Sequence, residues 1–190
     1  MLEEVIKEIY LTNSNSSLYR NKTQFKVGEG SPVYGEITQK GTNTLVNHFR
    51  KHFNKDTVFY DLGSGLGKMV LHIGLEYNVK KSVGIELSKE RHKGAMDAKE
   101  KYVKDNNKIE FHNLSYFKYD ISDATVIYCD NTAFADDVSE ELYKIIPSGC
   151  LFLFKRSIPS LDDKTSSFDD IERTYRQTKL LWIVKDLLNS

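Results

Sequence analysis

Apolar residues along this chain follow two repeating patterns, one helical and one extended. Residues 2–11 and 41–53 each place apolar side chains on one helical face. From residue 58, short apolar runs alternate with helical stretches, which predicts an α/β fold with a doubly wound, mostly parallel sheet and helices on both faces. The expected strands are 58–62, 82–86, 109–112, 124–129 and 150–154, and the expected helices between them are 68–77, 89–103 and 138–146.

The two ends of the chain depart from this alternation. Residues 12–31 are polar and lack periodicity, which predicts a long loop or a mobile lid. The acidic stretch 162–170 is predicted to form a loop, and the apolar run 179–185 predicts a late antiparallel strand at or near the sheet edge. Because no linker, internal repeat or low-complexity tract interrupts the chain, we expect residues 1–190 to form a single domain.

Three glycines follow the first expected strand. That strand ends in Asp61, and the turn after it reads Leu-Gly-Ser-Gly-Leu-Gly. Glycines permit a tight turn and the close approach of a ligand, and the helix that starts near the last glycine turns its free N–H groups toward that ligand. In open α/β sheets, ligands bind outside the carboxyl ends of the strands. The expected cofactor-binding residues here are Asp61, Gly63, Ser64, Gly65 and Gly67.

Several kinds of glycine turn compete for this segment. A P-loop needs four residues between its first glycine and Gly-Lys-Ser/Thr, but Gly63 and Gly67 are too close together and Met69 replaces the Ser or Thr. The dinucleotide fingerprint is GxGxxG, whereas this turn is GxGxG. A structural turn without a ligand stays open as an alternative. The acidic residue before Leu-Gly-x-Gly-x-Gly resembles the usual pattern of methyltransferases that use S-adenosyl-L-methionine.

The next two strand ends add candidates for the same ligand. Glu86 ends the second expected strand, 86 − 67 = 19 residues after Gly67, where an acidic side chain accepts hydrogen bonds from ribose hydroxyls. Asn113 and Leu114 follow the third strand, beside the expected adenine, so that Asn113 would bond the adenine edge and Leu114 would pack on its face. The alternatives are an exposed strand-end charge for Glu86 and a plain loop for the other two.

The region from about Ser31 to Pro159 resembles the non-SET histone-lysine methyltransferases of the disruptor-of-telomeric-silencing type. The resemblance implies a Rossmann-like class I methyltransferase with a seven-stranded sheet, in which residues 1–40 form an N-terminal helix and a loop over substrate and cofactor, and residues 41–190 form the catalytic core. The segments that carry the resemblance are Ser31-Pro-Val-Tyr-Gly-Glu36, Phe59-Tyr-Asp-Leu-Gly-Ser-Gly-Leu-Gly-Lys-Met-Val70, Cys129-Asp-Asn-Thr-Ala-Phe134 and Phe154-Lys-Arg-Ser-Ile-Pro159.

This resemblance implies an acceptor channel beside the cofactor. Tyr34, Tyr128 and Phe134 would form aromatic walls. Asn131 would orient a lysine amine through its side-chain oxygen, and Asp130 would do the same or help to remove the proton. Ordinary strand-end packing is the alternative for these residues. Glu36 would lie near the methionine end of the cofactor. The chain departs from the family motif at Asp130, where the family has Asn, and at Thr132, where it has Phe. These departures keep open an RNA or small-molecule methyltransferase and a cofactor-binding module without strong catalysis.

Charge and composition narrow the expected partners and compartment. The formal net charge is zero, and the chain lacks the basic excess of strong nucleic-acid binders, so a protein substrate is favoured over a nucleosome or nucleic acid. The N-terminus has no signal peptide and no stretch is long enough to span a membrane, which predicts an intracellular protein, cytoplasmic or nuclear. We expect buried free thiols at Cys129 and Cys150, no metal site, and helix-surface positions for His48, His52, His72 and His92.

Overall fold

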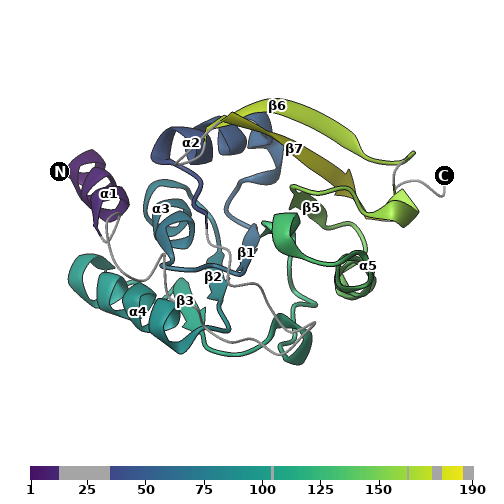
Figure 1. The fold of residues 1–190 in the computed structure, drawn as a ribbon. Helices are drawn as coiled ribbons and strands as arrows, with labels where there is room; N and C mark the ends of the chain where they lie inside the picture. Colours follow the sequence, from purple (N-terminus) through teal and green to yellow (C-terminus); the bar gives the residue numbers. More distant parts are fainter. Residues whose placement is uncertain (13–34, 104, 162, 173–176, 186–190) are drawn as a thin grey trace.

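The computed structural model describes residues 1–12, 35–103, 105–161, 163–172 and 177–185, and it has the predicted α/β architecture (Figure 1). Its strands form one sheet in the order β3-β2-β1-β4-β5-β7-β6. The strands are β1 (Val58–Leu62), β2 (Lys81–Ile85), β3 (Ile109–His112), β4 (Val126–Cys129), β5 (Leu151–Phe154), β6 (Ser166–Glu172) and β7 (Gln177–Val184). The α-helices are α1 (Leu2–Leu11), α2 (Gln39–His48), α3 (Lys68–Glu76), α4 (Lys89–Val103) and α5 (Asp136–Ile145).

The strands β1 to β5 run parallel, and their register sets the geometry of the candidate site. Asp61 in β1 lies opposite Gly84 in β2 and Tyr128 in β4. Side chains in a strand alternate between faces, so the positions two residues beyond these partners project to the same face as Asp61. Those positions are Glu86 and Asp130. The register therefore places three carboxylates on one face, at the carboxyl edge of three adjacent strands.

Alternating side chains of the sheet fill two hydrophobic cores. Phe59 faces the first core, which contains Ile9 of α1 and Leu45 of α2 together with residues of α3 and α4. Tyr60 faces the second core, which contains Leu142 of α5. Figure 1 shows α1 to α4 gathered on one side of the sheet and α5 on the other. The prediction of helices on both faces is therefore confirmed, although the two faces are covered unequally.

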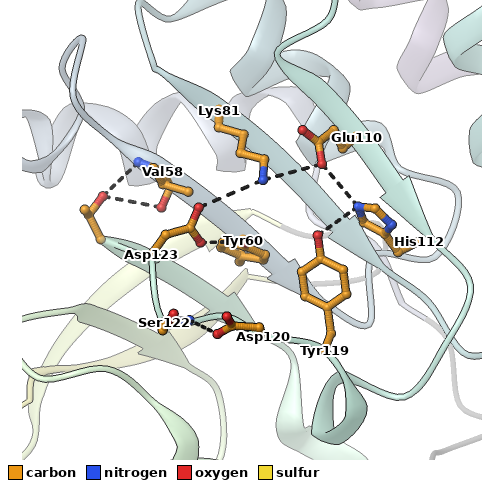
Figure 2. Close-up of polar contacts among 10 residues, drawn as sticks. Val58, Tyr60, Lys81, Glu110, His112, Tyr119, Asp120, Ser122 and Asp123 are labelled. Atoms are coloured by element: carbon orange, nitrogen blue, oxygen red, sulfur yellow. Dashed lines mark hydrogen bonds and ion pairs between the residues drawn. The ribbon is translucent and has the colours of Figure 1, made fainter.

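Polar contacts cover part of the second face where no α-helix lies. The connection from β3 to β4 contains a 3-10 turn, η3 (Tyr116–Lys118), and no α-helix. Lys81 of β2 lies 3.5 Å from the carboxylate of Glu110 and 3.9 Å from that of Asp123 (Figure 2). The hydroxyl of Tyr60 donates to Asp123 at 2.7 Å. This network ties the connection to the sheet without an apolar helix face.

The last two strands form an antiparallel hairpin at the sheet edge. β7 pairs with β5, as predicted for the apolar run 179–185, and β6 forms the outer strand. The prediction of a loop over 162–170 is wrong from Ser166 onward, because β6 begins there. An edge strand has only one neighbour and tolerates polar residues. Phe168 anchors it, since its ring stacks on that of His48 in α2 with centroids 3.8 Å apart.

The helix that precedes β1 begins earlier than its apolar pattern predicts. The side chain of Thr38 accepts a hydrogen bond from the N–H of Gly41 at 3.0 Å and caps α2, whose first residue is Gln39. The helix ends at His48, and a 3-10 turn, η2 (Arg50–His52), completes the expected 41–53 segment.

Two further predictions concern the cysteines and membrane-spanning helices. Cys129 and Cys150 are buried and free, as predicted. Within the described part of the chain, every helix is too short or too polar to cross a membrane.

Candidate active site

The glycine turn joins β1 to α3 and is fastened to the neighbouring strand. Its glycines all have positive φ, +92° at Gly63, +56° at Gly65 and +74° at Gly67. Residues with a Cβ rarely adopt this conformation. The N–H groups of Gly63 and Ser64 both donate to the carbonyl of Ile85 in β2, at 2.8 and 3.1 Å. The turn therefore has one defined shape at the centre of the sheet edge.

The first and last glycines of the turn have different surroundings. A Cβ added to Gly67 would lie 2.5 Å from ring carbons of Phe111 and 2.9 Å from the Cβ of Ala95. A Cβ added to Gly63 would meet nothing within 4 Å. Gly67 is thus required by packing, whereas Gly63 borders open space. The Oγ of Ser64 is buried without a hydrogen-bond partner among the described residues, and it lies so close to Gly84 of β2 that a Cβ there would be 2.6 Å from it.

Glu86 connects the end of β2 to the glycine turn. One carboxylate oxygen accepts from the N–H of Gly65 at 2.9 Å, and the other accepts from the N–H of Ser88 at 2.7 Å. Burial raises the pKa of Glu86, and the hydrogen bond from Ser88 acts in the opposite direction. The side chain is therefore a buried acceptor fixed beside the turn. Its predicted place at the cofactor site agrees with this geometry, and its bond to ribose stays a prediction.

Asp61 is a buried carboxylate at this edge, and its pKa is raised. Burial and, to a smaller extent, the nearby carboxylates of Glu86 and Asp130 raise its pKa to about 8. None of these causes is a cation, so among the described residues no positive charge is found to compensate the ionised form. The cluster therefore favours a cationic ligand, which would stabilise the ionised carboxylates.

A buried cation follows the glycine turn and was not anticipated from the sequence. Lys68 is 6% exposed, and its Nζ lies 2.8 Å from the carboxylate of Glu36 and 3.1 Å from the carbonyl oxygen of Tyr10. These contacts hold the segment that enters α2 and the end of α1 against the start of α3. Glu36 thus contacts a lysine to which the sequence assigned no role, and its place near the methionine end of the cofactor stays a prediction.

One histidine lies inside the protein and not on a helix surface. His72 of α3 is fully buried, which corrects its expected surface position. Its Nδ1 lies 3.0 Å from the hydroxyl of Tyr10, and its Nε2 lies 2.6 Å from the carboxylate of Glu76. The hydroxyl of Tyr10 also lies 2.8 Å from that of Thr42 in α2. These contacts attach α1 to the core, and burial lowers the pKa of His72. The pattern of apolar residues along the helix did not predict that His72 is buried, because the partners that surround the ring are polar.

Asn113 and Leu114 lie at the predicted adenine end. The side-chain amide of Asn113 donates to the carbonyls of Glu86 and Leu87, at 2.8 and 3.1 Å. These bonds tie the end of β3 to the turn between β2 and α4. Leu114 is partly buried against the second core. The structure brings Asn113 beside Glu86 and packs Leu114 against the second core, and the contacts of both residues with adenine stay predictions.

The predicted acceptor residues gather at the ends of β4 and β5. Asp130 caps the 3-10 turn η4 (Asn131–Ala133), accepting from the hydroxyl of Thr132 at 2.6 Å and from its N–H at 3.3 Å. Phe134 is half-buried, and its ring stacks on that of Tyr116, with centroids 6.2 Å apart. Tyr34 lies outside the described residues.

Asn131 lies among these residues but faces the protein interior. It is fully buried, and its side-chain oxygen accepts from the N–H groups of Lys155 and Arg156 at 2.9 and 2.7 Å. Both lone pairs of that oxygen are therefore used within the protein. The predicted bond from this oxygen to a lysine amine does not agree with this arrangement, in which the oxygen binds the backbone of the segment after β5.

The sequence matches the family model described as histone methylation protein DOT1 over residues 17–180. The chain belongs to this family. The predicted family resemblance is thereby confirmed, and it covers more of the chain than the four motifs do.

Two curated relatives are similar to parts of the chain. A protein-lysine N-methyltransferase of Saccharolobus islandicus (strain REY15A) is 39% identical over 74 residues, which cover 39% of this chain and 45% of the relative. A histone-lysine N-methyltransferase, H3 lysine-79 specific, of Caenorhabditis elegans is 32% identical over 116 residues, 55% of this chain and 12% of the relative. The chain thus spans less than half the length of either relative.

Solved structures share the fold. An RNA methyltransferase from Salinibacter ruber, in complex with S-adenosyl-L-homocysteine, has a TM-score of 0.63 and 23% identity over 80% of this chain and 94% of its own. A methyltransferase from Geobacter sulfurreducens, with the same ligand, has a TM-score of 0.53 and 17% identity over 80% and 55%. The Rossmann-like class I methyltransferase fold is therefore confirmed.

Proposed function

We propose that this protein transfers a methyl group from S-adenosylmethionine to a lysine side chain of a protein. The observation that supports this most directly is the pair of buried carboxylates, Asp61 and Glu86, on either side of a three-glycine turn with open space at Gly63. Membership of the histone methylation protein DOT1 family and the lysine-directed relatives favour a protein lysine as the acceptor.

The residues present fit the cofactor by charge and by shape. S-adenosylmethionine supplies a methyl group on a positively charged sulfur and also carries an ammonium group. Asp61 and Glu86 attract that charge, and Glu86 holds the turn in place through Gly65. Asn113 braces the adenine end, and Gly63 lets the cofactor approach the backbone. The protein thus contributes orientation and electrostatics, while the cofactor supplies the reactive group.

The acceptor side then has to present a neutral amine. A lysine ammonium loses a proton before its nitrogen can form the new carbon–nitrogen bond, and a desolvated channel lowers its pKa. Asp130 projects to the same face as Asp61 and would attract the ammonium and receive the proton. Phe134 would line the channel and exclude water. Alignment of the amine with the methyl group supplies much of the rate enhancement.

Methyl transfer from tritiated S-adenosylmethionine tests the proposal. The acceptors are recombinant histone octamer, poly-L-lysine and total RNA, followed by acid hydrolysis and amino-acid analysis. We expect label in methyl-lysine, with no label from a Gly65→Arg variant whose side chain fills the turn. Gly149→Ala is a matched control, because Gly149 also has positive φ (+74°) but lies outside the site. Label recovered from RNA alone would reject the lysine acceptor.

A further inference from the structure

Asn131 occupies all the hydrogen-bonding positions of its side chain within the protein. The oxygen accepts from the N–H groups of Lys155 and Arg156, as described above. The amide nitrogen donates to the carbonyl of Arg156 at 2.8 Å and to the hydroxyl of Ser139 in α5 at 3.4 Å. Asn131 thus connects the end of β4, the segment after β5 and the helix α5. Ser139 is buried as well, at 1% exposure.

The residues on either side of Asn131 are those predicted to meet the acceptor. Asp130 precedes it directly, and the N–H of Phe134 donates to the carbonyl of Asn131 at 3.0 Å. Arg156, held by Asn131 through its backbone, extends its guanidinium to the carbonyl of Phe134 and the carboxylate of Asp136. The side chain and the backbone of Asn131 therefore fix the positions of both Asp130 and Phe134.

Only an amide side chain satisfies these partners. Two backbone N–H groups require an acceptor, and a backbone carbonyl within 2.8 Å requires a donor. A carboxylate keeps the acceptors but places negative charge against the carbonyl of Arg156. An aliphatic side chain of similar size leaves three backbone groups without their bonds, and unsatisfied buried groups are costly.

We infer that Asn131 is a positioning residue for the acceptor wall, which consists of Asp130 and Phe134. It holds these two residues in place and does not itself touch the amine. This inference rests on the proposed function for the identity of the acceptor. The side-chain amide of Asn131 then affects how the acceptor is held. The glycine turn and Glu86 at the cofactor end do not depend on it.

Hydrogen exchange, calorimetry and methyl transfer on the full chain test this inference. The variants are Asn131→Leu, the conservative Asn131→Asp, and Ser139→Ala as a control that removes only the longest of the four bonds. In Asn131→Leu, the amides of Lys155 and Arg156 should exchange about tenfold faster, because a buried hydrogen bond is lost. Affinity for S-adenosylhomocysteine should fall much less than turnover does, because the glycine turn and its bond to Glu86 do not involve Asn131.

The kinetic result separates positioning from general structural damage. With poly-L-lysine as the acceptor, kcat/KM should fall roughly a hundredfold in Asn131→Leu, as for a misplaced reacting group. Asn131→Asp should keep the two amides protected and lose less activity, and Ser139→Ala should resemble the wild type. Unchanged exchange, or an equal loss of S-adenosylhomocysteine affinity, would overturn the inference. If the wild type transfers no methyl group, the proposed function fails, whereas the exchange data still decide whether Asn131 holds the wall.

Discussion

The carboxyl edge of the sheet has two halves that are built in different ways. At the cofactor end, formed by β1, β2 and β3, backbone conformation dominates: Gly63, Gly65 and Gly67 shape the turn, and Glu86 holds it through a backbone N–H. At the acceptor end, formed by β4 and β5, side chains dominate, and the buried amide of Asn131 joins three segments. At the cofactor end, Gly63 borders open space and the buried carboxylate of Asp61 has little compensation for its charge. At the acceptor end, the side-chain oxygen and nitrogen of Asn131 both have hydrogen-bond partners.

This difference explains which half suits a ligand of fixed chemistry. A cofactor that is always the same is met by a rigid backbone and by carboxylates whose charge it balances. An acceptor that varies between substrates is met by a wall whose shape depends on a few side chains. Substitutions at the two halves should therefore separate cofactor affinity from acceptor turnover, and the following variants test that separation.

The largest effect is expected from Gly67. Gly67→Ala places a Cβ 2.5 Å from the Phe111 ring in a backbone conformation that alanine disfavours, so the free energy of unfolding should fall by about 3 kcal/mol or more. Gly63→Ala meets no neighbour and should cost only about 1–2 kcal/mol of backbone strain, like Gly149→Ala. Urea denaturation measures all three. Calorimetry should then show that Gly63→Ala loses cofactor affinity while Gly149→Ala keeps it.

Asp61→Asn should have the next largest effect, confined to the cofactor end. Removing the buried carboxylate eliminates its attraction for the cationic cofactor, which should lower affinity for S-adenosylmethionine roughly a hundredfold. Affinity for S-adenosylhomocysteine should fall less, because that product lacks the charge on sulfur. Equal losses for the two ligands, measured by calorimetry, would show that Asp61 does not act through charge.

The pKa of Asp61 also predicts a pH dependence of stability. Its pKa is raised to about 8 in the folded protein from its ordinary value of 3.8, so the native state binds more protons than the unfolded state between these values. Stability of the free protein should therefore fall as pH rises from about 4 to 8, by at most about 1.4 kcal/mol per pH unit from this group. Asp61→Asn should flatten that slope, whereas S-adenosylmethionine should bind more tightly with rising pH. Thermal unfolding across pH checks both.

Glu86→Ala should weaken the cofactor end by a similar amount. The variant removes the acceptor for the N–H groups of Gly65 and Ser88 and for the expected ribose hydroxyls. Loss of charge-assisted bonds should reduce cofactor affinity by about 1.5–3 kcal/mol. Glu86→Gln keeps one oxygen acceptor and should lose less. If Glu86→Ala binds S-adenosylhomocysteine normally, the carboxylate serves only the turn.

The two halves also differ in how well the sequence predicted them. The positions of Asp61, the three glycines and Glu86 at the sheet edge were predicted because spacing along the chain fixes backbone turns and strand ends. Asn131 was placed correctly at the end of β4, but its partners lie on β5 and α5, far away in the sequence, so the direction of its side chain was missed. The same cause hid Lys68 and His72, whose polar partners come from α1 and the segment before α2.

The inner strands were predicted from the alternation of apolar runs and helical stretches, but the outer strand β6 was not. Buried strands such as β1 and β5 are almost continuous apolar runs, and these were predicted closely. β6 was missed because its sequence is polar and acidic, and it becomes a strand only by pairing with β7. Local composition therefore predicts a strand well where both faces of the sheet are buried. It predicts a strand poorly at the sheet edge, where the strand forms only because it pairs with one neighbour.

The smallest expected effect is at Asn113, which is the counterpart of Asn131 at the cofactor end. Asn113→Ala removes two hydrogen bonds to the carbonyls of Glu86 and Leu87 at a partly exposed position. Water can replace these bonds, so the loss should be about 1 kcal/mol or less. Affinity for S-adenosylhomocysteine should fall by roughly twofold to fivefold. The Michaelis constant for poly-L-lysine should not change, because the amide braces only the turn that carries Glu86. A larger effect on the lysine acceptor than on the cofactor would mean that the two halves of the sheet edge are coupled, and that each asparagine supports the whole site.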